Sequence, residues 1–131
     1  MTSPFAHRGV IEGYYGPPYS DADRRWLIEC IGRQGMNVYC YAPKNDPLQR
    51  AEWRTPYPDD AMQQFASLIA HGETHAVRVG FCLSPGLSMR YSDASDVRLL
   101  VAKLQRFTSI GARFLMLAFD DLLDDDRARI P

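Results

Sequence analysis

Two adjacent carboxylates, Asp120 and Asp121, directly follow an apolar segment at residues 113–119. Such a segment predicts a buried strand with acidic groups at its carboxyl end. In parallel α/β folds, and above all in (β/α) barrels, catalytic groups are displayed at that end of the strands. Two carboxylates held close together cannot both ionise easily, so the pKa of one rises toward the value that an acid catalyst needs. The pair therefore predicts a catalytic site, against the alternative that it belongs to a solvated acidic loop.

Two earlier loops carry residues that could serve the same site. Gly13, Tyr14 and Tyr15 follow a predicted strand at Gly9–Glu12. Glycine there lets a ligand approach the backbone, and tyrosine rings can line a sugar pocket. Lys44 follows the next predicted strand and opens a long polar and aromatic connection that ends at residue 58. Taken alone, the first loop is also typical of a tight turn, and Lys44 of a solvated lysine.

The segments that must position these loops alternate between two hydrophobic periods. Predicted strands cover Gly9–Glu12 and residues 36–42, 76–83 and 113–119. Predicted helices begin at Ser20 or Asp21, at Asp59 and after Ser92. The third of these helices carries a periodic apolar face, made of Val97, Leu100, Val101 and Leu104. This βαβαβαβ order predicts one parallel sheet whose loops meet at one edge.

The fold class that this order favours is α/β, as the first four strands of a TIM-type barrel. A flavodoxin-like open sheet is the alternative, but residues 13–18 match neither a dinucleotide-binding glycine motif nor a P-loop. A full barrel needs about 250 residues. Residues 1–131 are therefore expected to form one partial domain, a parallel (β/α) half-barrel. It would expose two strand edges and an apolar inner face, which predicts either a homodimer or a missing carboxyl-terminal half.

Composition sets modest limits on function. The chain is 46% hydrophobic with a formal net charge of -1, which favours neither a nucleic-acid partner nor a membrane surface. No signal segment opens the chain, so we expect a cytoplasmic protein. The three cysteines lack a CxxC pattern and are expected to be buried free thiols: Cys30, Cys40 and Cys82. Trp26 is expected to pack on its helix and Trp53 under the long loop.

Several short motifs together resemble glycoside hydrolase family 84, the β-N-acetylglucosaminidases that include protein O-GlcNAcases and hyaluronidase-like enzymes. They occur in the family's order along most of the chain: Arg-Gly-Val-Ile-Glu-Gly-Tyr-Tyr-Gly at 8–16, Met-Asn at 36–37 leading to Tyr-Ala-Pro-Lys at 41–44, Trp-Arg at 53–54, Ser-Pro-Gly-Leu at 84–87 and Phe-Asp-Asp-Leu at 119–122. Each motif is short, but the ordered set is specific.

The resemblance implies substrate-assisted, retaining hydrolysis of terminal β-linked N-acetylglucosamine in a glycoconjugate. The 2-acetamido oxygen of the substrate would attack the anomeric carbon and form an oxazoline, so no enzyme nucleophile, cofactor or metal is expected. By analogy, Asp120 would orient the acetamido N–H and stabilise charge on the oxazoline. Asp121 would protonate the leaving oxygen and then activate water.

The resemblance also implies the sugar contacts. Gly13 would bind the sugar through its backbone carbonyl and Lys44 would bind ring hydroxyls, with Tyr14 and Tyr15 as neighbours. Two positions depart from the family pattern: Asn45 stands where an acid usually follows the lysine, and Tyr19 where tryptophan is frequent.

Three alternatives stay open at this point. A family 18 chitinase would use acids spaced like Asp121, Asp124 and Asp126, but Ala128 occupies the position of its proton donor. A Mg²⁺ or Ca²⁺ site could use Asp120, Asp121 and Asp124, although no calcium-loop spacing supports it. The chain could also be a non-catalytic sugar-binding or assembly half-barrel. His7, His71 and His75 are assigned no catalytic role.

Overall fold

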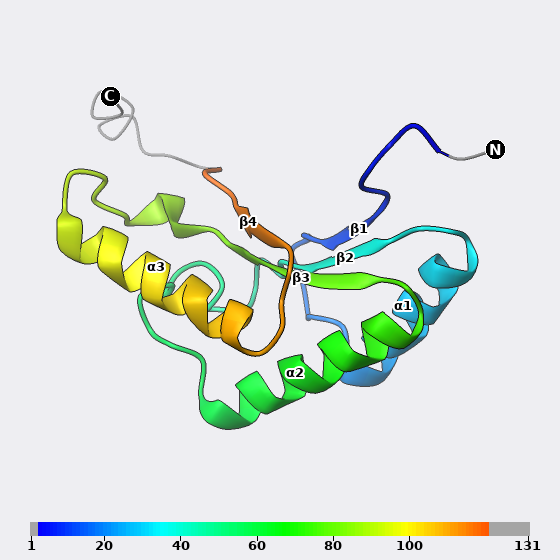
Figure 1. The fold of residues 1–131 in the computed structure, drawn as a ribbon. Helices are drawn as coiled ribbons and strands as arrows, with labels where there is room; N and C mark the ends of the chain where they lie inside the picture. The colour runs from blue at the N-terminus through cyan, green and yellow to red at the C-terminus, as the bar shows by residue number, and fades with distance from the viewer. Residues whose placement is uncertain (1–2, 121–131) are drawn as a thin grey trace.

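The structure, a computed structural model, describes residues 3–120 (Figure 1). Within that range, strands and α-helices alternate in the predicted order: β1 (Gly9–Glu12), α1 (Asp21–Arg33), β2 (Val38–Tyr41), α2 (Asp59–Thr74), β3 (Arg78–Leu83), α3 (Ala94–Ser109) and β4 (Leu115–Leu117). A short 3-10 turn, Pro85–Leu87, lies between β3 and α3. Asp121 and all later residues lie outside the described range.

The described strands form one parallel sheet in the order β1-β2-β3-β4. Gly9 pairs with Val38, Val38 with Arg78, and Phe81 with Leu115. Each connection crosses through a helix, and the helices cover one face of the sheet while the other face stays open (Figure 1). This is the predicted parallel half-barrel arrangement, with β1 and β4 as the two edges of the described sheet.

Strand alternation separates two sets of apolar side chains. Tyr39 and Phe81 face the helices and join the main core, in which the rings of Phe81 and Phe107 stack with centroids 4.4 Å apart. Cys40 and Cys82 point to the other face and belong to a second, smaller cluster, packed by partly buried Phe114, Met116 and Ala118. The inner face is therefore apolar but only thinly covered.

The helix starts follow local capping rules with one exception. Ser20 caps α1 in a capping box: its hydroxyl accepts the Asp23 N–H at 3.1 Å, and the Asp23 carboxylate accepts the Ser20 N–H at 3.3 Å. Asp93 caps α3 by accepting the Ser95 N–H at 2.8 Å. The exception is α2, which begins at Asp59 as predicted but has Pro58 at the cap position and therefore no side-chain cap bond. Asp59 instead accepts a hydrogen bond from Arg106 at 2.9 Å.

The predicted buried face of α3 is also partly wrong. Val97 and Val101 are 41% and 44% exposed, whereas Asp96 and Lys103 are buried together with Leu100. The physical reason is that both charged side chains find partners in the long loop before α2, so that this side of α3 turns inward. Apolar periodicity cannot detect a buried face that includes paired charges.

Two further expectations, on the burial of Trp26 and on the length of the last strand, are wrong. Trp26 is 63% exposed on the surface of α1. The predicted buried strand at 113–119 shortens to β4, and Phe119 is 45% exposed, since an edge strand is paired on one side only. The last sheet hydrogen bond runs from the Ala118 N–H to the Leu83 carbonyl, at 3.0 Å.

The remaining predictions on single residues are confirmed in part. Cys40 and Cys82 are buried free thiols, while Cys30 is only half-buried. Burial raises the pKa of the Cys40 thiol to about 12. Trp53 is fully buried under the long loop, as expected. No helix in the described part of the chain has the length and apolar character needed to cross a bilayer.

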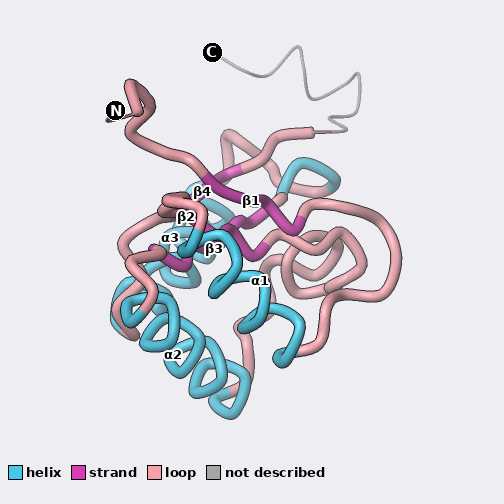
Figure 2. The backbone as a smooth tube through the Cα atoms, turned by 90° about the vertical axis from the view of Figure 1, so that its right-hand side faces the viewer, coloured by secondary structure: helices cyan, strands magenta, loops and turns pink. Residues whose placement is uncertain are grey.

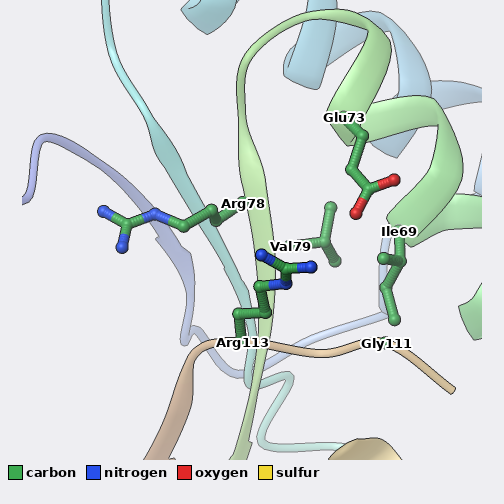
Figure 3. Close-up of a pocket in the computed structure, with 6 residues that line it drawn as sticks. All are labelled: Ile69, Glu73, Arg78, Val79, Gly111 and Arg113. Atoms are coloured by element: carbon green, nitrogen blue, oxygen red, sulfur yellow. The ribbon is translucent and has the colours of Figure 1, made fainter.

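A small cavity lies near the amino ends of β3 and β4. Its volume of about 20 Å³ suffices for roughly one water molecule. In the close-up, Glu73 and Arg113 extend toward one another, whereas Arg78 points away (Figure 3). The lining comprises Ile69, Glu73, Arg78, Val79, Gly111 and Arg113.

Candidate active site

The predicted site residues meet at the carboxyl edge of the sheet. Asp120 follows β4 and Lys44 follows β2, and the Lys44 ammonium donates a hydrogen bond to the Asp120 carboxylate. Arg50 brings a second cation, with its Nη1 atom 3.9 Å from Oδ2 of Asp120. The loops of two strands that are not neighbours in the sheet therefore converge on one carboxylate, as the parallel topology predicts.

The two cations stabilise the ionised form of Asp120. The hydrogen bond from Lys44 is the main cause that lowers the pKa of this carboxyl, and the Arg50 charge adds to it. Asp120 is therefore a carboxylate at neutral pH, suited to accept a hydrogen bond or to stabilise developing positive charge. It is unsuited to donate a proton. Asp121, for which we predicted that role, lies outside the described residues.

The loop after β1 joins the same edge. The Lys44 N–H donates to the Tyr14 carbonyl at 3.2 Å, which ties the β1 loop to the β2 loop. Arg50 donates to the Tyr15 hydroxyl at 3.0 Å, and the Tyr15 side chain is largely exposed beside it. Gly13 directly follows β1 and is exposed. The sequence pattern gave Arg50 no role, yet it links Tyr15 to Asp120.

Gly16 and Tyr14 shape this first loop. Gly16 adopts a φ of 124°, a backbone conformation that an L side chain rarely takes. The Tyr14 hydroxyl donates to the Pro17 carbonyl at 3.0 Å, and its ring packs on Tyr19 with centroids 5.2 Å apart. Tyr14 therefore supports the loop, while Tyr15 is the ring that faces outward at the site.

The buried carboxylate of Glu12, at the end of β1, holds the loop that follows this strand. Arg24 binds it through two hydrogen bonds of 2.8 and 2.9 Å, and the Tyr39 hydroxyl also donates to it. The Tyr19 N–H completes the set at 3.0 Å. Sequence reasoning missed this role, although a glutamate within a predicted buried strand is itself an informative signal.

The long loop that presents Lys44 and Arg50 is organised around Asp46. Its carboxylate accepts hydrogen bonds from the hydroxyls of Tyr41 at 2.7 Å and Tyr57 at 2.6 Å. The Leu48 N–H donates to the second oxygen at 2.9 Å. The two ends of the loop are thus held on one acid two residues from Lys44.

Lys103 of α3 fastens the middle of the loop. Its buried ammonium donates to the carbonyls of Leu48, Trp53 and Thr55, at 2.5, 3.0 and 2.6 Å. Burial lowers the pKa of Lys103 to about 8, while the three carbonyls supply the acceptors that an ammonium needs. Among the described residues, Lys103 bonds to the loop carbonyls and to none of the site side chains, so it acts through the loop.

Asp96, also on α3, fastens the end of the loop. This fully buried carboxylate accepts hydrogen bonds from Arg54 at 2.6 and 2.8 Å and from Arg90 at 2.9 Å or more. The bonds from Arg54, and then those from Arg90, hold the pKa of Asp96 well below its usual range. A second link joins Gln49 to Ser84, by a side-chain hydrogen bond of 2.8 Å and a backbone bond of 2.9 Å.

The chain is similar to known proteins in both sequence and structure. A family model described as β-N-acetylglucosaminidase matches residues 8–129. The protein O-GlcNAcases of Rattus norvegicus and Mus musculus are each 33% identical over 114 residues, which is 87% of this chain and 12% of theirs. A mutant O-GlcNAc hydrolase of Thermobaculum terrenum superposes with a TM-score of 0.89 at 33% identity, over 96% of this chain and 28% of that one.

The sheet and the acid at its carboxyl edge define part of a (β/α)-barrel enzyme. The chain belongs to the β-N-acetylglucosaminidase family, glycoside hydrolase family 84, as the ordered motifs predicted. It spans about an eighth of the length of the curated relatives. The chitinase alternative is thereby superseded. Of the alternative metal site, Asp121 and Asp124 lie outside the described residues, and Asp120 is bound to Lys44.

Proposed function

We propose that this chain supplies the amino-terminal part of the active site of a retaining β-N-acetylglucosaminidase. Its substrate class would be glycoconjugates with terminal β-linked N-acetylglucosamine. One observation carries the proposal: the carboxylate of Asp120, which follows β4, is paired with the Lys44 ammonium and lies 3.9 Å from the Arg50 guanidinium. A carboxylate in that state fits the charge-stabilising role, and membership of a family whose named relatives are O-GlcNAcases supports the reaction type.

The proposed reaction has two steps. In the first, the acetamido oxygen of the substrate attacks the anomeric carbon while the glycosidic bond breaks and Asp121 protonates the departing oxygen. Positive charge then develops on the oxazoline ring, and Asp120 accepts a hydrogen bond from its N–H. In the second, Asp121 removes a proton from water as the water oxygen attacks the anomeric carbon, and the acetamido group is restored with overall retention.

The loops supply positioning in this proposal. The Lys44 ammonium carries three donors, so it can hold Asp120 and still bind a sugar hydroxyl. Gly13 and Tyr15 are exposed in the loop after β1 and would contact the bound sugar there. Arg50 keeps Tyr15 and Asp120 in fixed relation. Each of these groups fixes the geometry of the sugar before the chemistry begins.

The open inner face bears on how this chain would act alone. Cys40 and Met116 line a hollow of about 260 Å³ on that face. We propose that turnover needs this face to be covered, either by a second copy of the chain or by the remaining part of a barrel. Activity that rises more than proportionally with protein concentration would support the homodimer. Strict proportionality in a monomeric sample would contradict it.

The test of function is hydrolysis of a fluorogenic β-N-acetylglucosaminide by the purified chain. Asp121→Asn is expected to lower kcat/KM by about 10²- to 10⁴-fold, as removal of an acid–base catalyst does. Asp120→Asn should lower kcat by about 10²- to 10³-fold, because charge stabilisation is lost. Asp59→Asn, at the far end of the long loop, is the matched control and should keep full activity.

A second substrate tests the mechanism. Fluorine atoms on the acetamido methyl group withdraw electrons from the attacking oxygen, so the trifluoroacetamido analogue should react much more slowly if the substrate supplies the nucleophile. Equal rates for the two substrates would contradict substrate assistance. A folded chain that binds N-acetylglucosamine without hydrolysing either substrate would contradict turnover and favour the non-catalytic sugar-binding half-barrel.

A further inference from the structure

A second group of chemically capable side chains lies far from Asp120. Glu29, His71 and His75 each offer one ligand atom, and these atoms all lie within 4.8 Å of one another. Nε2 of His71 is 3.5 Å from Oε1 of Glu29. The two imidazole rings have centroids 4.8 Å apart. All three side chains are half-buried.

The fold builds this group from two neighbouring helices. His71 and His75 are four residues apart at the carboxyl end of α2, so they lie on one side of it. Glu29 comes from α1, and the two helices lie side by side (Figure 2). Gly32 permits the close approach, because a Cβ atom there would lie 2.7 Å from the His75 carbonyl oxygen. The cluster therefore depends on a specific helix contact.

We infer that Glu29, His71 and His75 form a zinc site. Zn²⁺ binds imidazole nitrogen and carboxylate oxygen at about 2.1 Å, which sets tetrahedral ligand separations of about 3.4 Å. The Glu29–His71 separation already matches this value, and rotation of side chains closes the rest. Three protein ligands leave one position for water. Two imidazoles favour zinc over Mg²⁺ and Ca²⁺, which prefer oxygen ligands.

The surrounding contacts leave the ligand atoms accessible. Arg33 approaches Glu29 at 3.7 Å through Oε2, while the other oxygen, Oε1, faces His71. His71 Nε2 also lies 3.3 Å from the Arg25 carbonyl, and zinc would replace that single weak contact. Both helices end at this side of the molecule, and the partial negative charge of a helix carboxyl end favours a bound cation.

The inference goes beyond the proposed function and is independent of it. The zinc cluster lies where α2 leads into the amino end of β3, whereas the active site lies at the carboxyl ends of the strands. A strand the length of β3 separates the two ends by about 20 Å. Bound zinc would join α1 to α2 and stabilise the folded chain without touching substrate.

The test is calorimetric titration of the tag-free, chelator-treated chain with Zn²⁺, Mg²⁺ and Ca²⁺. Zinc should bind saturably at one ion per chain and raise Tm, whereas Mg²⁺ and Ca²⁺ should produce no comparable heat. His71→Ala and His75→Asn should each weaken zinc binding at least tenfold, and Glu29→Gln should weaken it by a similar factor. His7→Ala, which removes a histidine on another segment, should leave zinc binding unchanged.

A second measurement guards against variants that fail to fold. Co²⁺ bound to the unmodified chain should show the intense visible absorption of a tetrahedral centre, and added Zn²⁺ should displace it. Absence of saturable zinc binding, an octahedral cobalt spectrum, or binding that survives both histidine substitutions would each overturn the inference. Loss of zinc binding in His7→Ala would overturn it as well.

Discussion

The two ends of the sheet are built differently. At the carboxyl end, long loops are fixed by buried charges: Glu12 binds Arg24, Asp96 binds Arg54, and Lys103 binds backbone carbonyls. At the amino end, helices lead into strands through short turns that use positive φ angles, at Gly35, Ala76 and Gly111. Buried charges are costly unless fully paired. The chain places them where loops hold the proposed site, whereas the turns at the amino end rely on backbone conformation.

The largest effect on stability is expected from removing the buried charge of Lys103, which holds the middle of the long loop. Lys103→Met leaves three inward carbonyls without their donor, so the free energy of unfolding should fall by about 3 kcal/mol. Urea unfolding measures it. Arg98→Met, on the exposed side of the same helix, should change stability by less than about 0.5 kcal/mol. Equal effects of the two substitutions would show that the loop does not depend on Lys103.

Asp96 gives a test that depends on pH. Its pKa is lowered in the folded chain by Arg54 and then Arg90, whereas an unfolded aspartate titrates near about 3.9. Its stabilisation is therefore complete above about pH 4 and is lost as pH falls below that value. Asp96→Asn should be about 2 kcal/mol less stable at pH 7, with the difference shrinking in acid. A difference that stays constant from pH 7 to pH 3 would refute the ionic role.

Replacing Lys44 tests whether this residue controls the ionisation of Asp120 in the proposed site. With Lys44→Met, Asp120 loses the main cause of its lowered pKa, so the acidic limb of the pH–rate profile should move to higher pH. Activity at neutral pH should fall about tenfold, as expected for one lost charge-assisted contact. Arg33→Met, on the surface of α1, should leave the profile unchanged. An unmoved acidic limb in Lys44→Met would show that another group controls Asp120.

The smallest expected effect lies at the opposite end. Ala76 adopts a φ of 57°, which is unfavourable for a residue with a Cβ atom. Ala76→Gly should therefore raise the free energy of unfolding by roughly 0.5 kcal/mol, after the entropy lost by glycine is subtracted. Thermal unfolding can detect this change. The control is Ala102→Gly, at an exposed position of α3, which should lower stability by a similar amount. A loss of stability in Ala76→Gly would count against the turn argument.

The sequence predicted most of the architecture because hydrophobic period and turn residues are local signals. Strand ends in a parallel sheet share one edge, so the meeting of Lys44 with Asp120 followed from topology. Asp96 and Lys103 could not be predicted, because their burial depends on carbonyls and arginines some 40 to 55 residues away. Periodicity treats such side chains as exposed. The acid–base role of Asp121 was implied by the family resemblance, and this residue lies outside the described range.

The strictly sequential strand order has a consequence for how the molecule is made. Each βαβ unit is complete once its second strand has been synthesised, so β1 to β3 can pair before β4 exists. The contact between Lys44 and Asp120 joins residues 76 positions apart, and its carboxylate arrives with the final described strand. On the ribosome, the first three strands can therefore pair before the Lys44–Asp120 ion pair of the proposed site can form.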